Sequence, residues 1–304
     1  MEKFYKTYSI KFEIGTLDFK RDEPIEITQT IYVTYPLTAE FAIGRSISSA
    51  TNSAQVRIYN LEEDKRRWLY KDEVDIHTFI RMIIYAGYNG ELSEIYRGSV
   101  NSCYSIRNGG DPDFVTVIDS CDAVLDMYLG KVSRSYDGMA EPQNILNDIG
   151  STLYDLKISF ISPNIEFSPK SRSSNVSGKT VEKLRELSVD TYGNQTMSID
   201  NGEIYFLVPD NDIIEKFGVL QIDCDHGLLG SPRRRNSYIT AEVLFEPKAR
   251  LNQIALLESS TVPWLNQAYK IMGVSHNGVI SGSKDGALTT TLDLFVGLGE
   301  WDYV

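Results

Sequence analysis

The sequence predicts a mainly β protein with an α+β insert, in which two similar β-barrel domains flank a small α+β domain. Two observations lead to this fold class. Short runs rich in Ile, Val, Tyr, Thr and Phe, separated by Gly, Asn, Asp and Pro, fill both ends of the 304-residue chain, whereas helical spacing concentrates in the middle. We therefore expect a first β-barrel domain over residues 1–120, the insert over 121–224 and a second β-barrel domain over 225–304.

In the first domain, strand-like runs alternate with turn clusters. The runs cover residues 7–13, 25–33, 54–59, 79–85, 95–105 and 114–118. One short helix is expected near residues 60–70, with Asn60 as its N-cap, acidic residues in its first turn, and Leu61, Trp68 and Leu69 as its buried positions. The pattern is typical of an all-β domain with a short helical plug.

The middle of the chain combines helices with a hairpin. Helical spacing predicts helices at residues 122–129, 141–153 and 179–190. Pro142 stands near the start of the second, where its fixed φ suits the first turn. Asn201-Gly202 separates two short strands, and this dipeptide accepts the positive φ angles of a tight hairpin turn. The segment 162–178 is rich in Ser, Pro and Asn and is expected to be an exposed loop.

The last domain opens on a turn-rich stretch. Gly227, Gly230 and Pro232 are typical turn residues. The run 239–246 then alternates apolar and polar side chains until Pro247 ends the strand. The sequence thus predicts a new all-β unit from this point.

The two outer domains share an order of segments. Residues 53–60 resemble residues 239–246, and each run is followed by an apolar strand. A loop then leads to a strand that ends in Gly and Val, at Val100 in the first domain and Val274 in the second. The residue identities match weakly, but the order and the spacing agree, which predicts a duplicated unit.

Composition restricts the function. The chain is 42% hydrophobic and 24% charged, which is ordinary for a soluble globular protein. A net charge of −12 argues against a nucleic-acid binder, because such a protein needs a basic surface to displace counterions from phosphates. An acidic surface does suit a channel through which DNA passes without being held.

The N-terminus lacks the apolar core of a signal peptide, and no stretch approaches the roughly 20 apolar residues of a membrane helix, so we expect no membrane partner.

Three cysteines, Cys103, Cys121 and Cys224, are odd in number and far apart. This spacing disfavours a disulfide framework and a zinc site made of cysteines alone. We expect small buried thiols in a reducing compartment.

Two motifs with possible ligands have simpler explanations. Gly178-Lys179-Thr180 imitates the end of a phosphate-binding loop, but Ser173 stands where that loop requires glycine, so a helix start is the better interpretation. Asp223 and the run Cys224-Asp-His226 gather metal-binding residue types beside an alternating strand, whose neighbouring side chains point to opposite faces. We expect no bound cofactor and no metal.

Catalytic patterns are equally weak. None of the three histidines, His77, His226 and His276, accompanies a serine or cysteine in a nucleophile elbow. The paired carboxylates occur at a helix start and in a turn, where capping and turn formation explain them: Glu62, Glu63, Asp111 and Asp113. We therefore expect no catalytic residue and no enzymatic activity.

A series of short motifs resembles the bacteriophage tail hub proteins of the baseplate, which are related to the hub of the type VI secretion spike. In the first domain the motifs begin at Phe41-Ala-Ile-Gly, Asn52-Ser-Ala-Gln-Val, Ile84-Tyr-Ala-Gly and Ile95-Tyr-Arg-Gly. In the second they begin at Gly227-Leu-Leu-Gly and Tyr269-Lys-Ile-Met-Gly. The series covers most of the chain in the expected order, and its specificity lies in that order. The resemblance implies tube-type barrels and a homotrimer at the tip of a phage tail.

Five residues are candidates for a subunit or partner interface. Arg233, Arg234 and Arg235 form the one dense basic run, which fits either a solvated turn or a contact with an acidic neighbouring protomer. Trp301 and Tyr303 lie beyond the last expected strand. They could anchor a partner chain or fold back on their own barrel.

Two classes of function remain open. The first is a structural virion protein, a trimeric hub that connects a sixfold tail tube to a threefold central spike. Its partners would be tube or tube-initiator proteins, the spike and the tape-measure protein, with DNA only passing through its channel. It would reside in the virion tail tip and, during assembly, in the host cytoplasm. The alternative is a surface enzyme or carbohydrate-binding module with a site in the middle domain.

Overall fold

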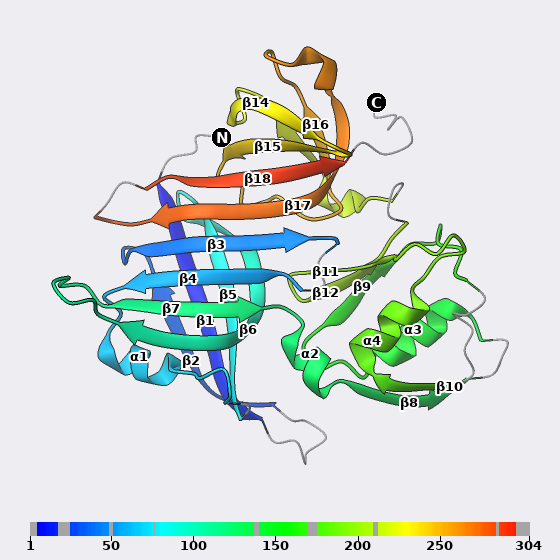
Figure 1. Ribbon diagram of the computed structural model, residues 1–304, viewed down its shortest axis with the longest axis horizontal. Coiled ribbons are helices and arrows are strands. Elements are labelled where there is room, and N and C mark those ends of the chain that lie inside the picture. The colour runs from blue at the N-terminus through cyan, green and yellow to red at the C-terminus, as the bar shows by residue number, and fades with distance from the viewer. Residues whose placement is uncertain are drawn as a thin grey trace.

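The computed structural model describes the chain over residues 5–17, 25–48, 51–75, 77–136, 140–168, 175–208, 212–283 and 286–295 (Figure 1). The fold is mainly β, as the sequence predicts. Thirteen strands belong to one sheet, in which eleven follow the hydrogen-bonded order β14-β15-β18-β17-β3-β4-β7-β6-β5-β1-β2, while β16 pairs with β17 and β13.

The first β unit contains seven strands and one short helix. Their bounds are β1 (Lys6–Leu17), β2 (Ile25–Thr34), β3 (Ala39–Ser46), β4 (Ser53–Tyr59), α1 (Glu63–Leu69), β5 (Thr78–Tyr88), β6 (Glu91–Ile106) and β7 (Val115–Cys121). Strands β1, β2 and β5 pass behind β3, β4 and β7 in Figure 1 and cover one face of them.

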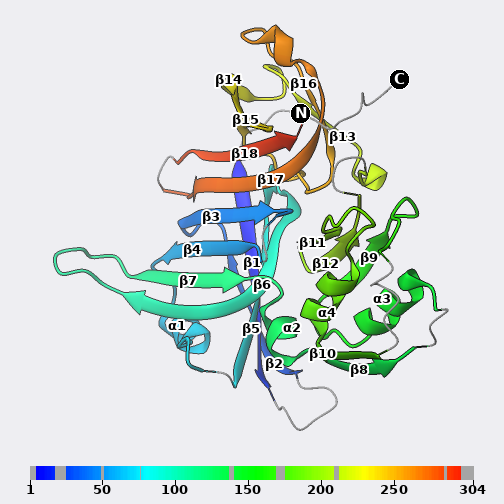
Figure 2. The ribbon, with the colours of Figure 1, turned by 45° about the vertical axis from the view of Figure 1, so that its right-hand side comes forward.

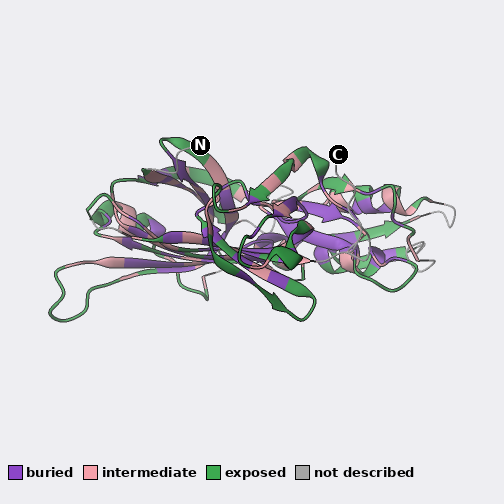
Figure 3. Cartoon of the chain, turned by 90° about the horizontal axis from the view of Figure 1, so that it is seen from above, coloured by how far each residue is buried: buried purple, intermediate pink, exposed green. Residues whose placement is uncertain are grey.

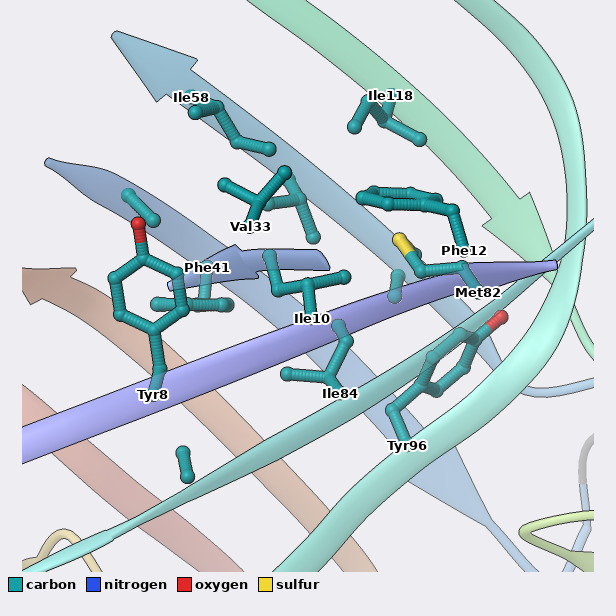
Figure 4. Packing of buried hydrophobic residues seen from close by; sticks show 14 of the residues in the cluster. Tyr8, Ile10, Phe12, Val33, Phe41, Ile58, Met82, Ile84, Tyr96 and Ile118 are labelled. Carbon is teal, nitrogen blue, oxygen red and sulfur yellow. The ribbon is translucent and has the colours of Figure 1, made fainter. Parts of the chain in front are cut away.

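Side chains that alternate between the two faces of each strand form the core between the layer of β1, β2 and β5 and the layer of β3, β4 and β7. On β1, Tyr8, Ile10 and Phe12 point inward and are nearly or fully buried. Figure 4 shows them against Phe41 and Ile84 from neighbouring strands. Burial of each such side chain stabilises the fold by about 1.5–3 kcal/mol relative to leaving it in water.

The helix α1 differs from the expectation in two respects. Its N-cap is Glu62, and Asn60 instead takes a left-handed conformation with φ 54°. The side chain of Asn60 bonds to Asp113 and to the backbone N–H of Phe114, so it closes the turn before β7. Trp68, expected to be buried, is 51% exposed. A seven-residue helix lying on a sheet edge buries only one narrow stripe, here Leu69.

The insert is a small α+β unit beside the ends of the β strands. Its elements are α2 (Val124–Leu129), β8 (Lys131–Ser135), α3 (Pro142–Gly150), β9 (Lys157–Ile161), β10 (Asn175–Lys179), α4 (Thr180–Leu187), β11 (Met197–Asp200) and β12 (Glu203–Phe206). Asn201 and Gly202 have φ of 50° and 79°, as the predicted hairpin between β11 and β12 requires. Part of the segment expected to be an exposed loop is a strand, because β10 pairs with β8.

The second β unit contains six strands. They are β13 (Val219–Ile222), β14 (Leu228–Arg235), β15 (Tyr238–Leu244), β16 (Ile254–Leu257), β17 (Gln267–Ile280) and β18 (Leu288–Phe295). The stretch expected to be a run of turns lies mostly in β14, where a bulge between Leu229 and Arg233 absorbs Gly230 and Pro232. A separate core under these strands includes Ala241, Leu292 and Val274.

The two β units join edge to edge. Strand β17 pairs with β3 over eight residues, from Gly273 opposite Ser46 to Ile280 opposite Ala39. Within the described ranges, no ladder joins the β14 end of the sheet to the β2 end, so the hydrogen bonds form one curled sheet and close no barrel. Figure 2 shows the continuous strands beside the insert, and Figure 3 shows burial inside the layers with exposed projecting hairpins.

The strand order within the sheet repeats. The first unit runs β3-β4-β7-β6-β5 and the second runs β14-β15-β18-β17-β16. In both, the first two strands along the chain pair, the third lies farthest away, and the fourth and fifth return between them. The two units differ in the strand that follows these five in the sheet. In the first unit β1 runs antiparallel to β5, whereas in the second β13 runs parallel to β16.

Candidate assembly interface

One face of the sheet, the one not covered by β1, β2 and β5, carries small polar side chains across the strands from β15 to β7. Pairing aligns them in rows. One row consists of Thr289, Asn277, Ala42, Gln55 and Asp119. The next consists of Glu242, Thr291, Ser275, Gly44 and Ser53. Each of these residues is exposed or half-buried, so the two rows are mainly hydrophilic, and Tyr238 and Leu244 of β15 add exposed apolar side chains to the same face.

The charges on this face are mainly negative. On the strands from β15 to β7 it carries the carboxylates of Glu40, Asp119, Glu242 and Asp293 against the single guanidinium of Arg57. These few charges are spread over many neutral side chains, so this part of the face repels a polyanion weakly, while Arg233 and Arg235 of the adjoining β14 lie on the same side of the sheet.

The three candidate arginines lie on the edge strand β14. Arg233, Arg234 and Arg235 are exposed and pair through their backbone with Thr240, Ile239 and Tyr238 of β15. The structure places them in a strand and not in a turn and leaves them exposed to solvent, and their role in a contact stays a prediction. The other candidates, Trp301 and Tyr303, lie outside the described residues.

A buried ion pair joins the first β unit, the insert and the second β unit. Arg45 on β3 donates from Nη1 to Oδ1 of Asp200 at 2.8 Å, and their side chains are 0% and 4% exposed. Its Nη2 donates to the carbonyl of Ala249 at 2.9 Å and lies 3.4 Å from Nε2 of His276. Burial, with Arg45 and Arg250 nearby, lowers the pKa of His276, so the neutral imidazole accepts at Nε2.

A second buried contact fixes the insert to the first unit. Asn52 donates its backbone N–H and its side-chain amide to the two oxygens of Asp122, each at 2.8 Å. The same amide donates to the carbonyl of Ile199 at 2.8 Å. Burial raises the pKa of Asp122 to about 7, which outweighs the opposing effect of the two donors.

This pKa predicts a pH-dependent stability. Between the unfolded value of about 4 and the folded value, the folded chain holds a proton that the unfolded chain has released, so stability falls as pH rises through this window. The slope from this group is at most ~1.4 kcal/mol per pH unit. We expect Asp122→Asn to lose it, measured by urea unfolding of both proteins at about pH 5 and pH 7. Equal slopes in the two proteins would contradict the assignment.

The motifs weighed for chemistry occupy ordinary positions. Among the described residues, no group of three or more His, Cys, Asp or Glu side chains could hold a metal ion. His226 lies in a turn with its Nδ1 2.7 Å from the carboxylate of Asp223. Lys179 ends β10 and Thr180 begins α4. Cys103 is buried as expected, whereas Cys224 is exposed.

We call the buried contacts of Arg45 with Asp200 and of Asn52 with Asp122 the junction. None of these four residues was identified from the sequence. Arg45 and Asn52 lie at motifs of the family resemblance, but neither these motifs nor the surroundings of Asp122 and Asp200 indicate a buried polar contact. The only signal was the position of Asp200 directly before Asn201-Gly202, which indicated a turn but no partner.

The fold is that of phage tail and type VI secretion proteins. The 43 kDa tail protein of prophage MuSo2 from Shewanella oneidensis aligns with a TM-score of 0.53 at 7% identity, over 94% of this chain and 97% of that chain. The tail protein from Neisseria meningitidis MC58 gives 0.51 at 8%, over 95% and 96%. The E. coli c3393 protein, a type VI secretion component similar to T4 tail proteins gp27 and gp5, gives 0.51 at 8%, over 88% and 76%.

The match to a family model is more specific than the similarity of fold. The family model described as Baseplate hub gp41 matches residues 25–285, and the chain therefore belongs to that family of baseplate hub proteins. No curated protein matches the sequence. Among the described residues, no helix is long and apolar enough to cross a membrane.

Proposed function

We propose that the chain is a structural virion protein, a homotrimeric hub of a phage tail tip that connects a sixfold tail tube to a threefold spike. The observation that carries this proposal is the repeated strand order, β3-β4-β7-β6-β5 and β14-β15-β18-β17-β16, within one continuous sheet. Three copies of a chain with two equivalent units present six units in a ring. A sixfold partner can then contact one side while the ring keeps true threefold symmetry.

The sheet face that carries the two polar rows is the surface we assign to the channel. The side chains of these rows are mainly short and polar, and Glu40, Asp119, Glu242 and Asp293 add weak repulsion toward phosphate. In a closed ring, each unit would contribute a barrel-like wall, with the face covered by β1, β2 and β5 turned outward. The insert then contacts other baseplate components.

The partners follow from that placement. The hub would contact tail tube or tube-initiator proteins above, the central spike below and the tape-measure protein inside, while DNA passes through. This function is mechanical, requires no cofactor, and places the protein in the virion tail tip after assembly in the host cytoplasm.

The stoichiometry of the purified chain tests the proposal. Light scattering over a range of concentrations should give a mass three times that of the 34.3 kDa chain at the upper end. Counting this protein in intact particles should give three copies for each tail, against the six subunits of the one tube ring that it contacts. A chain that stays monomeric, is absent from particles, and binds or cleaves cell-wall sugar would contradict the hub and support the alternative of a surface enzyme or binding module.

A further inference from the structure

We infer that the acidic and aromatic run at residues 300–303 docks into a hollow between the first β unit and the insert of the same chain, with Trp301 as its anchor. Residues 296–304 lie outside the described ranges, so the inference rests on the hollow, on the composition of the run and on its reach from β18. It goes beyond the proposed hub and does not depend on the number of copies in that hub.

The hollow lies where the chain passes from β7 into the insert. It has a volume of about 450 Å³ and lies between the loop before β4, the end of β7 and the helices α2 and α4 (Figure 1). Val124 and Met127 from α2 and Val181 from α4 form its apolar lining, and Tyr128, which is 76% exposed, adds an aromatic ring. A hollow of this size and lining fits one large apolar side chain together with its flanking backbone.

The charge around the hollow is opposite in sign to that of the whole chain. Lys179 and Arg185 line it, and Lys131 pairs with Lys179 between β8 and β10. Among the described lining residues, Glu182 is the one carboxylate, and it lies 3.4 Å from the ammonium of Lys179. Three cations near one exposed carboxylate form a local basic patch on a chain whose net charge is −12. Such a patch favours an acidic ligand.

Arg185 is the cation that a ligand carboxylate would stabilise most. It is half-buried, and burial lowers the pKa of its guanidinium, while the nearby Asp122 acts in the opposite direction. Asp122 is itself buried and accepts bonds from Asn52 at both of its oxygens. A carboxylate of the run would therefore add to the compensation of a cation that is already partly removed from water.

The end of the chain has the complementary composition. Glu300 and Asp302 flank Trp301, and Tyr303 follows, so acidic and aromatic side chains alternate. Tryptophan is enriched among the residues that dominate binding, because its large ring fills a pocket with little loss of side-chain freedom. Two glycines precede the run, and glycine accepts backbone conformations closed to other residues, so the connection can turn toward the hollow.

The run starts on the correct side of the sheet. Strands β18, β3 and β7 point in the same direction, because one antiparallel strand lies between each and the next. Cys121, which lines the hollow at the end of β7, is aligned by the ladders with Thr291 of β18. Phe295, the last residue of β18, therefore lies beyond that level on the side where the hollow is.

The distance is within reach of the run. Four strand spacings of about 4.8 Å and four residues of about 3.3 Å place Phe295 roughly 23 Å from Cys121 on a flat sheet. Six extended residues span about 20–22 Å, and the side chain of Trp301 adds the remaining distance. The run can thus enter the hollow of its own chain.

The thiol of Cys121 reports whether the hollow is filled, because it lines the hollow and is half-buried. Cys103 is buried, and Cys224→Ser removes the exposed thiol, so a maleimide then reads Cys121. In this background of the full chain, we expect Trp301→Ala to raise the labelling rate of Cys121 at least about tenfold, as it would if the docked state were favoured about tenfold over the open one.

Two further variants separate docking from a general effect on the fold. Glu300→Lys with Asp302→Lys keeps the indole and should raise the labelling rate as well, because the run then carries the same sign of charge as the hollow. Trp264→Ala is the matched control: it removes another tryptophan, 78% exposed in the loop before β17, and should leave the rate unchanged. Circular dichroism of each variant confirms that the fold is kept.

Fluorescence tests the same contact from the side of the run. The chain has three tryptophans, so Trp68→Phe with Trp264→Phe leaves Trp301 as the single emitter. We expect it to be shielded from acrylamide, and Lys179→Gln with Arg185→Gln should increase its quenching and move its emission to longer wavelength. Lys183→Gln on the same helix, where Lys183 pairs with Glu186, should change neither.

The outcomes that contradict the inference are distinct from those that contradict the hub. Equal labelling of Cys121 with and without the indole, together with a Trp301 that is fully open to acrylamide, overturns the docking. Protection that disappears when the protein is diluted to monomers would mean that the run comes from a neighbouring copy, and overturns its assignment to the same chain. Neither result bears on the hub, which is judged by mass and copy number.

Discussion

Replacing Asp200 with asparagine is expected to lower the free energy of unfolding by about 3–5 kcal/mol. Asp200 is the carboxylate of the buried junction, and the substitution leaves the guanidinium of Arg45 in a site that is closed to water. The half-buried Arg250 lies in the same region and would lose part of its counter-charge as well. Removing one partner of a buried pair costs much more than the pair contributes, because the other charge remains desolvated.

The measurement is urea unfolding of the wild type and of Asp200→Asn, followed by circular dichroism. Glu186→Gln is the matched control: it removes the carboxylate of an exposed pair with Lys183 on α4, and we expect a change within about 0.5 kcal/mol. A loss below about 1 kcal/mol in Asp200→Asn would mean that the junction is hydrated in solution and does not hold the three parts together.

Local physics made much of the fold predictable. The Asn201-Gly202 turn, the proline at the start of α3 and the alternating strands depend on residues close in sequence, and the structure contains all three. The repeat was visible for a related reason, since equal spacing between strands survives where residue identities do not. The errors lie where tertiary contacts override propensity. Trp68 lies on a helix with too little partner surface to cover it, and Asn60 closes a turn instead of capping a helix.

The interface candidates show the same limit. The basic run Arg233, Arg234 and Arg235 can be seen directly in the sequence, and its interpretation as a contact remains a prediction. Only the pairing pattern shows that Arg233 lies on an edge strand and that a bulge precedes it. The junction could not be predicted at all, because Arg45 and Asp200 are 155 positions apart and Asn52 and Asp122 are 70 apart. Buried polar pairs of this kind follow from how units dock, and no local pattern marks them.

Replacing Phe245 with alanine is expected to destabilise the chain by about 3–5 kcal/mol and to weaken the coupling between the two β units. Phe245 directly follows β15 of the second unit, yet it is fully buried in the core of the first. Its ring lies 5.8 Å from that of Tyr88 and 5.4 Å from that of His276, and its carbonyl accepts a 2.9 Å bond from the hydroxyl of Tyr88. The substitution opens a cavity where this side chain of the second unit packs in the core of the first.

The neighbouring residue supplies the control for this experiment. Leu244 points the other way and is 40% exposed, so Leu244→Ala should cost less than about 1 kcal/mol. Urea unfolding of both variants, followed by circular dichroism and by fluorescence, gives the two free energies and shows whether the transitions coincide. If Phe245→Ala cost no more than Leu244→Ala, the two units would be stable without each other. The β3 to β17 ladder alone would then hold the two units in register.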